Sequence, residues 1–387
     1  MDRTTYAHTA TRKRWWLLAA AAAAALAIPL VPSGAVAAEA DACAYGYTAS
    51  ASVFFGAGSA SSGVANYDTG DGCTVMDEVM AGAPFASHGK FLSTVNGVTN
   101  ELRKQGVLTS AETSDIVAAA AASEVGKPQP VTGTRSVDLS KIGLASFTTR
   151  TQMQADPAGT ITGLANCGYQ NIEMSGAVGR YHGNTAETLA TLAGSVGIDV
   201  PSIGISLNDL KTNLAGVISD AQAYGAEYVR FSPGSNWTLA DFSREAAFLN
   251  EVGAQLAPYG IKVAVHNHAT EFRAQENGVT GYEVLLRETD PELVAMELDV
   301  YWAESGGADA VELFQTYPGR FALLHLKDRA ADGSFSDVGE GTIDFAKIFA
   351  NASLGGVQYG HVENDSPRPD GITSACNSFG NLAELRY

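Results

Sequence analysis

The sequence predicts an α/β protein, a (β/α)8 TIM barrel preceded by a small, mainly helical N-terminal module. Short apolar runs alternate with helical patterns over about 250 residues, the rhythm of a barrel in which a helix follows each strand. The eight predicted strands are residues 141–146, 170–174, 198–205, 227–232, 261–267, 293–299, 320–326 and 357–363. The predicted helices are 156–166, 185–196, 208–224, 239–257, 279–288, 308–317 and 342–352.

A doubly wound open sheet is the alternative to a closed barrel. That fold normally carries a glycine-rich phosphate-binding turn after its first strand. Residues 146–150, which follow the first predicted strand, read SFTTR and contain no glycine. The barrel is therefore the favoured interpretation.

The composition excludes several classes of protein. The chain has 387 residues, of which 45% are hydrophobic, so it can bury a large core. Its 42 acidic residues outnumber its 24 basic residues and give a net charge of −18. This charge argues against nucleic acid, anionic lipid and highly phosphorylated molecules as partners.

The N-terminus has the pattern of a secretory signal peptide over residues 1–38. Basic residues 12–14 precede the apolar run 17–28, and small residues at 35–38 follow it. A Sec signal is the first expectation; Lys13 and Arg14 leave a twin-arginine signal as the alternative. Removing this segment takes away four basic residues and one acid, so the mature chain carries −21. We expect a secreted, extracellular protein without a membrane anchor.

The rest of the chain divides into three predicted parts. Residues 39–126 form the N-terminal module, with an Ala/Ser/Gly-rich lead-in over 39–65 and helical patterns at 75–80, 91–102 and 111–123. Residues 127–136 form a linker rich in Pro, Thr and Gly, and residues 137–387 form the barrel. The module carries no catalytic pattern; cell-wall or polysaccharide contact and homodimer formation are its open roles.

The four cysteines of an exported chain indicate disulfides. Cys43 and Cys73 are neighbours in the sequence, which favours their pairing. Cys167 follows the first barrel helix and Cys376 lies in the last helical segment; these helices are adjacent in a closed barrel, which favours the second pair. Two buried free thiols are the alternative for the second pair.

Polar residues end five of the predicted strands, where the active site of a barrel lies. Residues two apart share a face of a strand, as do His266 and His268 or His361 and Glu363. Carboxylates and imidazoles that converge on one mouth suit a divalent cation such as Mn, Co, Zn, Fe or Mg. The residues at these strand ends are Glu173, His266, Asn267, His268, Glu297, Asp299, His325, His361 and Glu363.

Several long motifs resemble one family. They are VAVHNHATEF (263–272), MELDVYWAESGGAD (296–309), LLHLKDRAADGSFSDVGEGTIDFAKI (323–348) and GHVENDSP (360–367), with an opening β-α-β segment at 143–174. Over residues 137–387 the sequence is similar to the xylose isomerase-like TIM barrels, which include sugar phosphate isomerases/epimerases and dehydratases.

The resemblance implies a metal held by residues that end strands 5 to 8, commonly Glu, Asp, His and Glu. Asp299, His325 and Glu363 match the last three positions, and His266 stands where many members have Glu. His266 is the favoured fourth ligand, with His268 or Glu271 as alternatives. A second departure is Gly204, where the family often has His.

The resemblance also implies roles near the metal. The candidates for moving the proton α to a carbonyl are Glu173, His268, Glu271 and Lys327, and the candidate substrate-binding residues are His182, Trp302 and Asn267. We expect a divalent-metal-dependent sugar isomerase or epimerase that acts on a small, non-phosphorylated sugar or keto-sugar. A 3-keto-glycoside lyase or hydratase and a non-catalytic sugar-binding barrel are the alternatives.

Overall fold

The computed structural model describes residues 43, 45–70 and 72–387. The predicted signal peptide lies outside these residues. Within the described part of the chain, no helix combines the length and the apolar character needed to cross a bilayer.

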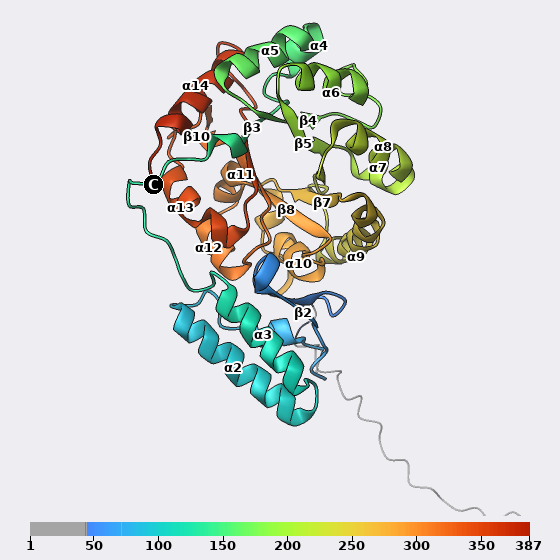
Figure 1. Cartoon of the computed structure of the whole chain (residues 1–387), viewed down its shortest axis with the longest axis vertical. Coiled ribbons are helices and arrows are strands. Elements are labelled where there is room, and N and C mark those ends of the chain that lie inside the picture. Colours follow the sequence, from blue (N-terminus) through green and yellow to red (C-terminus); the bar gives the residue numbers. More distant parts are fainter. Residues whose placement is uncertain (1–42, 44, 71) are drawn as a thin grey trace, which may run out of the picture. The chain divides into compact units, whose positions relative to one another are not determined.

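Eight parallel strands close into a barrel, which confirms the predicted fold (Figure 1). The strands neighbour one another in the order β12-β3-β4-β5-β6-β7-β8-β9, so the first and last barrel strands close the ring. Every predicted strand overlaps an observed one, with ends that differ by at most three residues. The bounds are β3 (Ile142–Ala145), β4 (Asn171–Ser175), β5 (Asp199–Gly204), β6 (Tyr228–Phe231), β7 (Lys262–His266), β8 (Val294–Asp299), β9 (Leu323–Leu326) and β12 (Tyr359–Val362).

Helices follow the strands as predicted, with one division and two additions. The predicted helix 208–224 is two helices because Asn213 leaves the helical conformation and caps the second one through its side chain. The helices that match predictions are α5 (Pro157–Cys167), α6 (Ala186–Ser195), α7 (Leu207–Thr212), α8 (Leu214–Tyr224), α9 (Leu239–Leu256), α10 (Gly281–Glu288), α12 (Ala310–Thr316) and α13 (Phe345–Gly355). Helix α14 (Gly371–Glu384) is the expected last helical segment that contains Cys376, and the two additions are α4 (Arg150–Ala155) and α11 (Val300–Ser305).

Both predicted disulfides are present, Cys43–Cys73 and Cys167–Cys376. The second joins the end of α5 to α14 and so links the first and last helices around the barrel. Tyr169 strengthens this seam: its ring lies 4.7 Å from the Phe379 ring and its hydroxyl donates to the Ala375 carbonyl at 2.8 Å. Two disulfides are typical of proteins in an oxidising environment.

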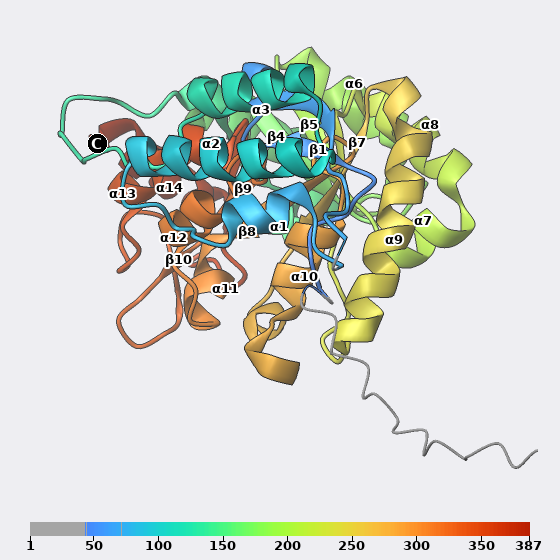
Figure 2. The same ribbon diagram turned by 90° about the horizontal axis from the view of Figure 1, so that it is seen from below.

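Before the barrel, three helices and a hairpin share a core of their own. The helices are α1 (Val75–Met80), α2 (His88–Gln105) and α3 (Ser110–Ala122), and α2 and α3 lie side by side (Figures 1 and 2). The Ala/Ser/Gly-rich lead-in is ordered from Ser52 onward, where β1 (Ser52–Phe54) and β2 (Ser61–Ala65) pair as an antiparallel hairpin. Val53, Phe55 and Val64 are buried against the helices, and these apolar residues explain the order of a segment otherwise rich in Ala, Ser and Gly.

A two-stranded hairpin and short 3-10 turns complete the described chain. Strand β10 (Asp328–Arg329) pairs with β11 (Phe335–Ser336) in the loop after β9. The 3-10 turns are η1 (Gly58–Ala60), η2 (Leu139–Lys141), η3 (Ala257–Tyr259), η4 (Thr270–Phe272) and η5 (Glu276–Gly278).

Candidate active site

Two imidazoles and a carboxylate meet inside the C-terminal mouth of the barrel. His266 ends β7, Asp299 ends β8 and His325 lies on β9, and one ligand atom from each lies within 4.8 Å of the others. The Asp299 Oδ2 is 4.0 Å from His266 Nε2 and 3.9 Å from His325 Nδ1. The Glu363 Oε2, just past β12, is 2.8 Å from His325 Nδ1. The structure thus brings together the four residues predicted as metal ligands.

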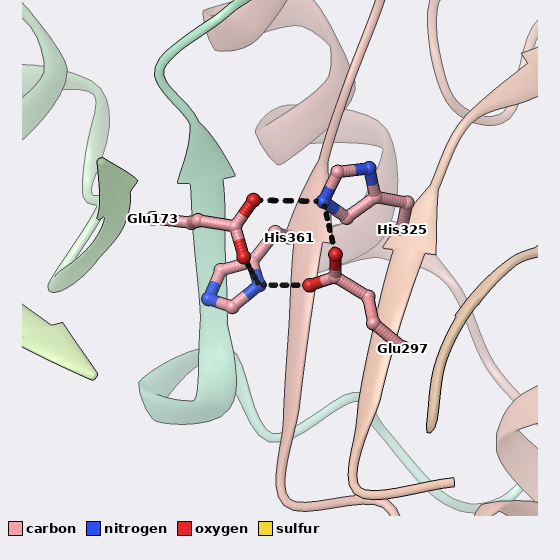
Figure 3. Close-up of side chains that lie close together, drawn as sticks. All are labelled: Glu173, Glu297, His325 and His361. Carbon is pink, nitrogen blue, oxygen red and sulfur yellow. Dashed lines mark hydrogen bonds and ion pairs between the residues drawn. The ribbon is translucent and has the colours of Figure 1, made fainter. Parts of the chain in front are cut away.

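A layer of buried carboxylates lies beneath the two imidazoles. The Glu297 Oε2 is 3.1 Å from His266 Nδ1 and 3.2 Å from His325 Nε2, so one oxygen contacts both rings. The Glu173 Oε1 lies 3.1 Å from the same His325 nitrogen (Figure 3). Each imidazole therefore has one nitrogen fixed by a carboxylate and the other directed toward Asp299.

The lower carboxylates are kept ionised by the groups around them. Burial alone would raise the pKa of Glu297, but the charge of His325 and its hydrogen bonds hold that pKa well below its usual range. The pKa of Glu173 is also lowered, against its burial, by the Arg230 guanidinium. Arg230 Nε donates to Glu173 Oε1 at 2.8 Å, and Ser202 Oγ donates to its other oxygen at 2.7 Å.

The donor set fits a divalent cation. A metal-bound histidine usually donates its second ring nitrogen to a carboxylate, and both His266 and His325 have that arrangement. The Asp299 Oδ2 is buried and accepts no well-aligned hydrogen bond. Burial opposes a charge on His325, yet Glu297, Glu363 and Glu173 raise its pKa well above the usual value, so the pocket strongly favours positive charge. Imidazoles with carboxylates suit the borderline metals better than an all-oxygen site would.

Lys327 supplies a second positive charge at this mouth. Its Nζ lies 2.9 Å from Asp299 Oδ2, 2.7 Å from Glu363 Oε2 and 3.2 Å from an Asp365 oxygen. Burial would lower the pKa of Lys327, but these carboxylates raise it. Lys327 is therefore an ammonium, able to donate a hydrogen bond or a proton but not to accept one.

Glu271 differs from the other carboxylates because one of its oxygens is unused. It is 1% exposed, and its Oε2 accepts from the His268 backbone N–H and from Thr270 Oγ1, each at 3.0 Å. Its Oε1 is buried without a hydrogen-bond partner, and burial raises the pKa of this carboxyl. Desolvation lowers the pKa of the neighbouring His268 to about 4, so its imidazole is neutral at pH 7.

The three predicted substrate-binding residues lie in different surroundings. Asn267 is fully buried, and its side-chain amide forms two hydrogen bonds with the Asp299 backbone. Its Oδ1 accepts from the Asp299 N–H at 3.0 Å, and its Nδ2 donates to the Asp299 carbonyl at 3.2 Å. It therefore positions Asp299, and its side chain has no exposed surface at the mouth. Trp302 borders the mouth, with its ring 5.7 Å from the His268 ring and 5.6 Å from Lys327 Nζ. His182 lies at the ends of β3 and β4, where its Nε2 is 2.8 Å from Ser146 Oγ.

Sequence reasoning did not assign a role to Glu297, His361 or Arg230. Glu297 and His361 share a strand face with Asp299 and Glu363, so the alternation of side chains was an available signal. His361 Nδ1 lies 3.8 Å from Glu173 and 3.7 Å from Glu297, as Figure 3 shows. The position of Arg230 depends on Gly204. A Cβ atom at residue 204 would lie 2.8 Å from the guanidinium carbon, so the glycine leaves space for the arginine side chain.

Comparisons with known proteins agree with this barrel. The family model described as xylose isomerase-like TIM barrel matches residues 164–356. The chain is 34% identical over 110 residues to an inosose dehydratase of Geobacillus kaustophilus, and this match spans 24% of the chain and 34% of the dehydratase.

Solved structures show the same fold at low sequence identity. A sugar phosphate isomerase/epimerase from Parabacteroides distasonis has a TM-score of 0.57 and 23% identity, over 66% of this chain and 98% of that one. The IOLI protein, solved with a zinc atom, has a TM-score of 0.51 and 16% identity, over 64% and 99% of the two chains. The barrel of this chain therefore belongs to the xylose isomerase-like TIM barrel family.

Proposed function

We propose that this barrel is a divalent-metal-dependent isomerase or epimerase of a non-phosphorylated sugar or keto-sugar. The observation that carries the proposal is the pair of imidazoles, each with one nitrogen held by Glu297 and the other facing Asp299. This arrangement directs one nitrogen of each imidazole and a carboxylate oxygen to one point, and a metal bound there would displace the proton that the surrounding carboxylates favour on His325.

His266, Asp299, His325 and Glu363 would hold the metal. A divalent cation bound there would polarise a sugar carbonyl and its neighbouring hydroxyl and stabilise the negative charge that develops on oxygen. Zinc is named in the IOLI structure; for this chain, Mn, Co and Fe are also compatible with two imidazoles and two carboxylates, and Mg, which prefers oxygen ligands, fits them less well.

Glu271 is the proposed base for the proton α to the carbonyl. Its free oxygen and raised pKa suit proton transfer better than Glu173, whose oxygens are occupied by Arg230, Ser202 and His325. His268, neutral beside it, is the alternative acceptor. Lys327 is positioned to donate to the substrate oxygen, because its ammonium remains charged among three carboxylates.

The charge of the mouth supports an unphosphorylated substrate. Asp299, Glu363 and Asp365 surround Lys327, and Glu297 and Glu173 lie below with Arg230 beside them, so the carboxylates outnumber the basic side chains. A phosphate group would meet a negative potential at this mouth.

Dehydration or elimination is the second candidate, favoured by the similarity to inosose dehydratase. It begins with the same proton abstraction α to the carbonyl. The electron pair of that C–H bond then expels the β-hydroxyl or glycosidic oxygen, which takes up a proton from a donor such as Lys327. A barrel that binds sugar without turnover is the third candidate.

Metal content measured by elemental mass spectrometry tests the proposal first. The wild-type protein should carry about one equivalent, and the His325→Ala, Glu363→Ala double variant should carry none. Incubation of the metal-loaded enzyme with keto-sugars in D2O should then place deuterium α to the carbonyl. The Asp299→Asn variant should abolish that exchange yet remain folded, because an asparagine side chain still caps α11 as Asp299 does.

Two results would overturn the proposal. A protein that takes up no metal after incubation with each cation would leave the sugar-binding barrel as the better function. Exchange accompanied by loss of water or of an alcohol would favour the lyase.

Export of the mature chain, with contact to cell wall or a second copy through residues 39–126, remains a proposal that fits the two disulfides.

A further inference from the structure

A polar cleft lies beside the proposed active site, on the side of the β10–β11 hairpin. Its volume is about 660 Å³, within the range of small-molecule sites. The hairpin and the loop after β12 form its walls, and α11 lies beside β10 (Figure 2). The Tyr301 hydroxyl donates to the Gly333 carbonyl at 2.7 Å and fixes the hairpin against α11.

Aromatic side chains lie between the cleft and the catalytic groups. The Phe335 ring, which lines the cleft, lies 5.8 Å from Lys327 Nζ and 5.9 Å from the Trp302 ring. Asn364, on the opposite wall, directly follows the proposed ligand Glu363. A ligand that reacts near Lys327 and extends past Phe335 therefore enters the cleft.

The chemistry of the lining indicates what extends into the cleft. The partly exposed Phe335 ring can pack against the C–H face of a sugar, and the buried Tyr301 ring lies 4.7 Å from it. Hydroxyl, amide and carboxylate groups surround these rings, and within the described chain the side chains of Ser336, Glu340 and Arg368 make no hydrogen bond or ion pair of their own. These unused donors and acceptors are the groups that bind sugar hydroxyls.

The charge of the cleft narrows the class of ligand further. Three acidic residues, Asp332, Asp337 and Glu340, line the cleft with one basic residue, Arg368. A phosphorylated, sulfated or uronic acid unit would be repelled by this excess of carboxylates. A neutral sugar unit meets hydrogen-bonding groups without that penalty.

We infer that the substrate is a glycoside or disaccharide, whose second, neutral sugar unit occupies this cleft while the reacting ring lies at Lys327. This inference rests on the proposed function, since it assigns the reacting ring to that site. It predicts that the enzyme distinguishes its substrates mainly through contacts at the β10–β11 hairpin, and less through contacts at the proposed catalytic site.

Calorimetric titration with two probes tests the inference, using 3-ketoglucose and 3-ketocellobiose on the metal-loaded full chain. The disaccharide should bind at least tenfold more tightly than the monosaccharide to the wild-type protein. Phe335→Ala should reduce this preference to about twofold or less without changing monosaccharide affinity. Glu340→Gln, an exposed position that leaves the hairpin intact, should reduce it in the same direction. Tyr259→Ala, at an exposed aromatic residue before β7, should leave the preference unchanged and serves as the control.

Equal affinity of the wild-type protein for both probes, or no binding of either, would overturn the inference. Equal losses for both probes in Phe335→Ala would also overturn it. Deuterium exchange α to the ketone, measured separately, tests the proposed function. Preference for the disaccharide without deuterium exchange would support the sugar-binding cleft and contradict the isomerase. Deuterium exchange without that preference would support the isomerase and contradict the cleft.

Discussion

At the scale of single residues, Glu297 is the group on which the site depends most. One of its oxygens contacts His266 and His325, so a single side chain sets the orientation of both rings. Glu297→Gln keeps the size but removes the charge and places an amide against at least one ring nitrogen. We expect metal affinity to fall by roughly 10–100-fold, the usual cost of losing such a partner. Competition with a chromogenic chelator measures it.

The matched control for this substitution is Glu251→Gln, an exposed position on α9. It makes the same chemical change away from the barrel mouth and should leave the affinity unaltered. Unchanged affinity in Glu297→Gln would show that the imidazoles are oriented by packing alone.

His182 gives a prediction about pH. Its backbone is left-handed, with φ of 48°, and burial lowers the pKa of its imidazole to about 4. The unfolded chain takes up this proton near pH 6.5, whereas the folded chain does not until near pH 4. Stability from the neutral imidazole is therefore fully present above pH 6.5 and is lost as the pH falls toward 4. Below that pH no further loss comes from this group.

The His182→Asn variant isolates this effect, because asparagine tolerates the left-handed backbone. The difference in unfolding free energy between wild type and variant should fall by on the order of 2 kcal/mol between pH 6.5 and 4, allowing for partial exposure. Urea unfolding at a series of pH values measures it. A constant difference would mean that the pKa of His182 is the same in the folded and the unfolded chain.

At the scale of elements, the seam between α5 and α14 is closed by Cys167–Cys376. The bridge encloses 209 residues, whereas Cys43–Cys73 encloses 30. In the chain-entropy description, the longer loop stabilises the fold by about 1–2 kcal/mol more than the shorter one. The Cys167→Ser, Cys376→Ser variant should therefore have a lower urea midpoint than the Cys43→Ser, Cys73→Ser variant. If the Cys43→Ser, Cys73→Ser variant had the lower urea midpoint instead, the N-terminal disulfide would contribute more to the unfolding free energy than the disulfide between α5 and α14.

Strand-level features could be predicted from the sequence because each has a local signal. The eight barrel strands are apolar runs, and Asp299, His325 and Glu363 come at their ends. The short helix α11 was not predicted: its start is capped by Asp299 itself, a residue that the sequence offered as a ligand. One carboxylate serves both purposes, with Oδ1 accepting from the Trp302 N–H and Oδ2 facing the site.

The missed parts of the site depend on contacts between distant segments. Nothing near Arg230 in the sequence shows that it will neutralise Glu173, because the contact needs the open space above Gly204. The order of β1 and β2 likewise depends on Val53 and Val64 packing against helices that come later in the chain. The role of the predicted ligands stays a prediction, although the structure places them together.

At the scale of the whole molecule, metal and fold should be thermodynamically linked. Without a cation, Lys327 is the ammonium that lies between Asp299 and Glu363. A ligand that binds only the folded state at about 100 times its Kd stabilises that state by about 2.7 kcal/mol. In a barrel of this size, such a change raises Tm by roughly 5–10 °C. Thermal unfolding in EDTA and in excess Mn, Co or Zn measures it.

Lys327→Met makes this linkage stronger, because it removes the protein's own cation from a pocket of carboxylates. In EDTA the variant should melt well below the wild type, since Asp299 and Glu363 are left as buried charges without a partner. Added metal should restore most of the loss, so the metal-induced rise in Tm becomes larger than in the wild type. Asp299→Asn should instead show little rise. If Lys327→Met melts at the same temperature with and without metal, the carboxylates take up protons rather than a cation, and the barrel holds no metal at this mouth.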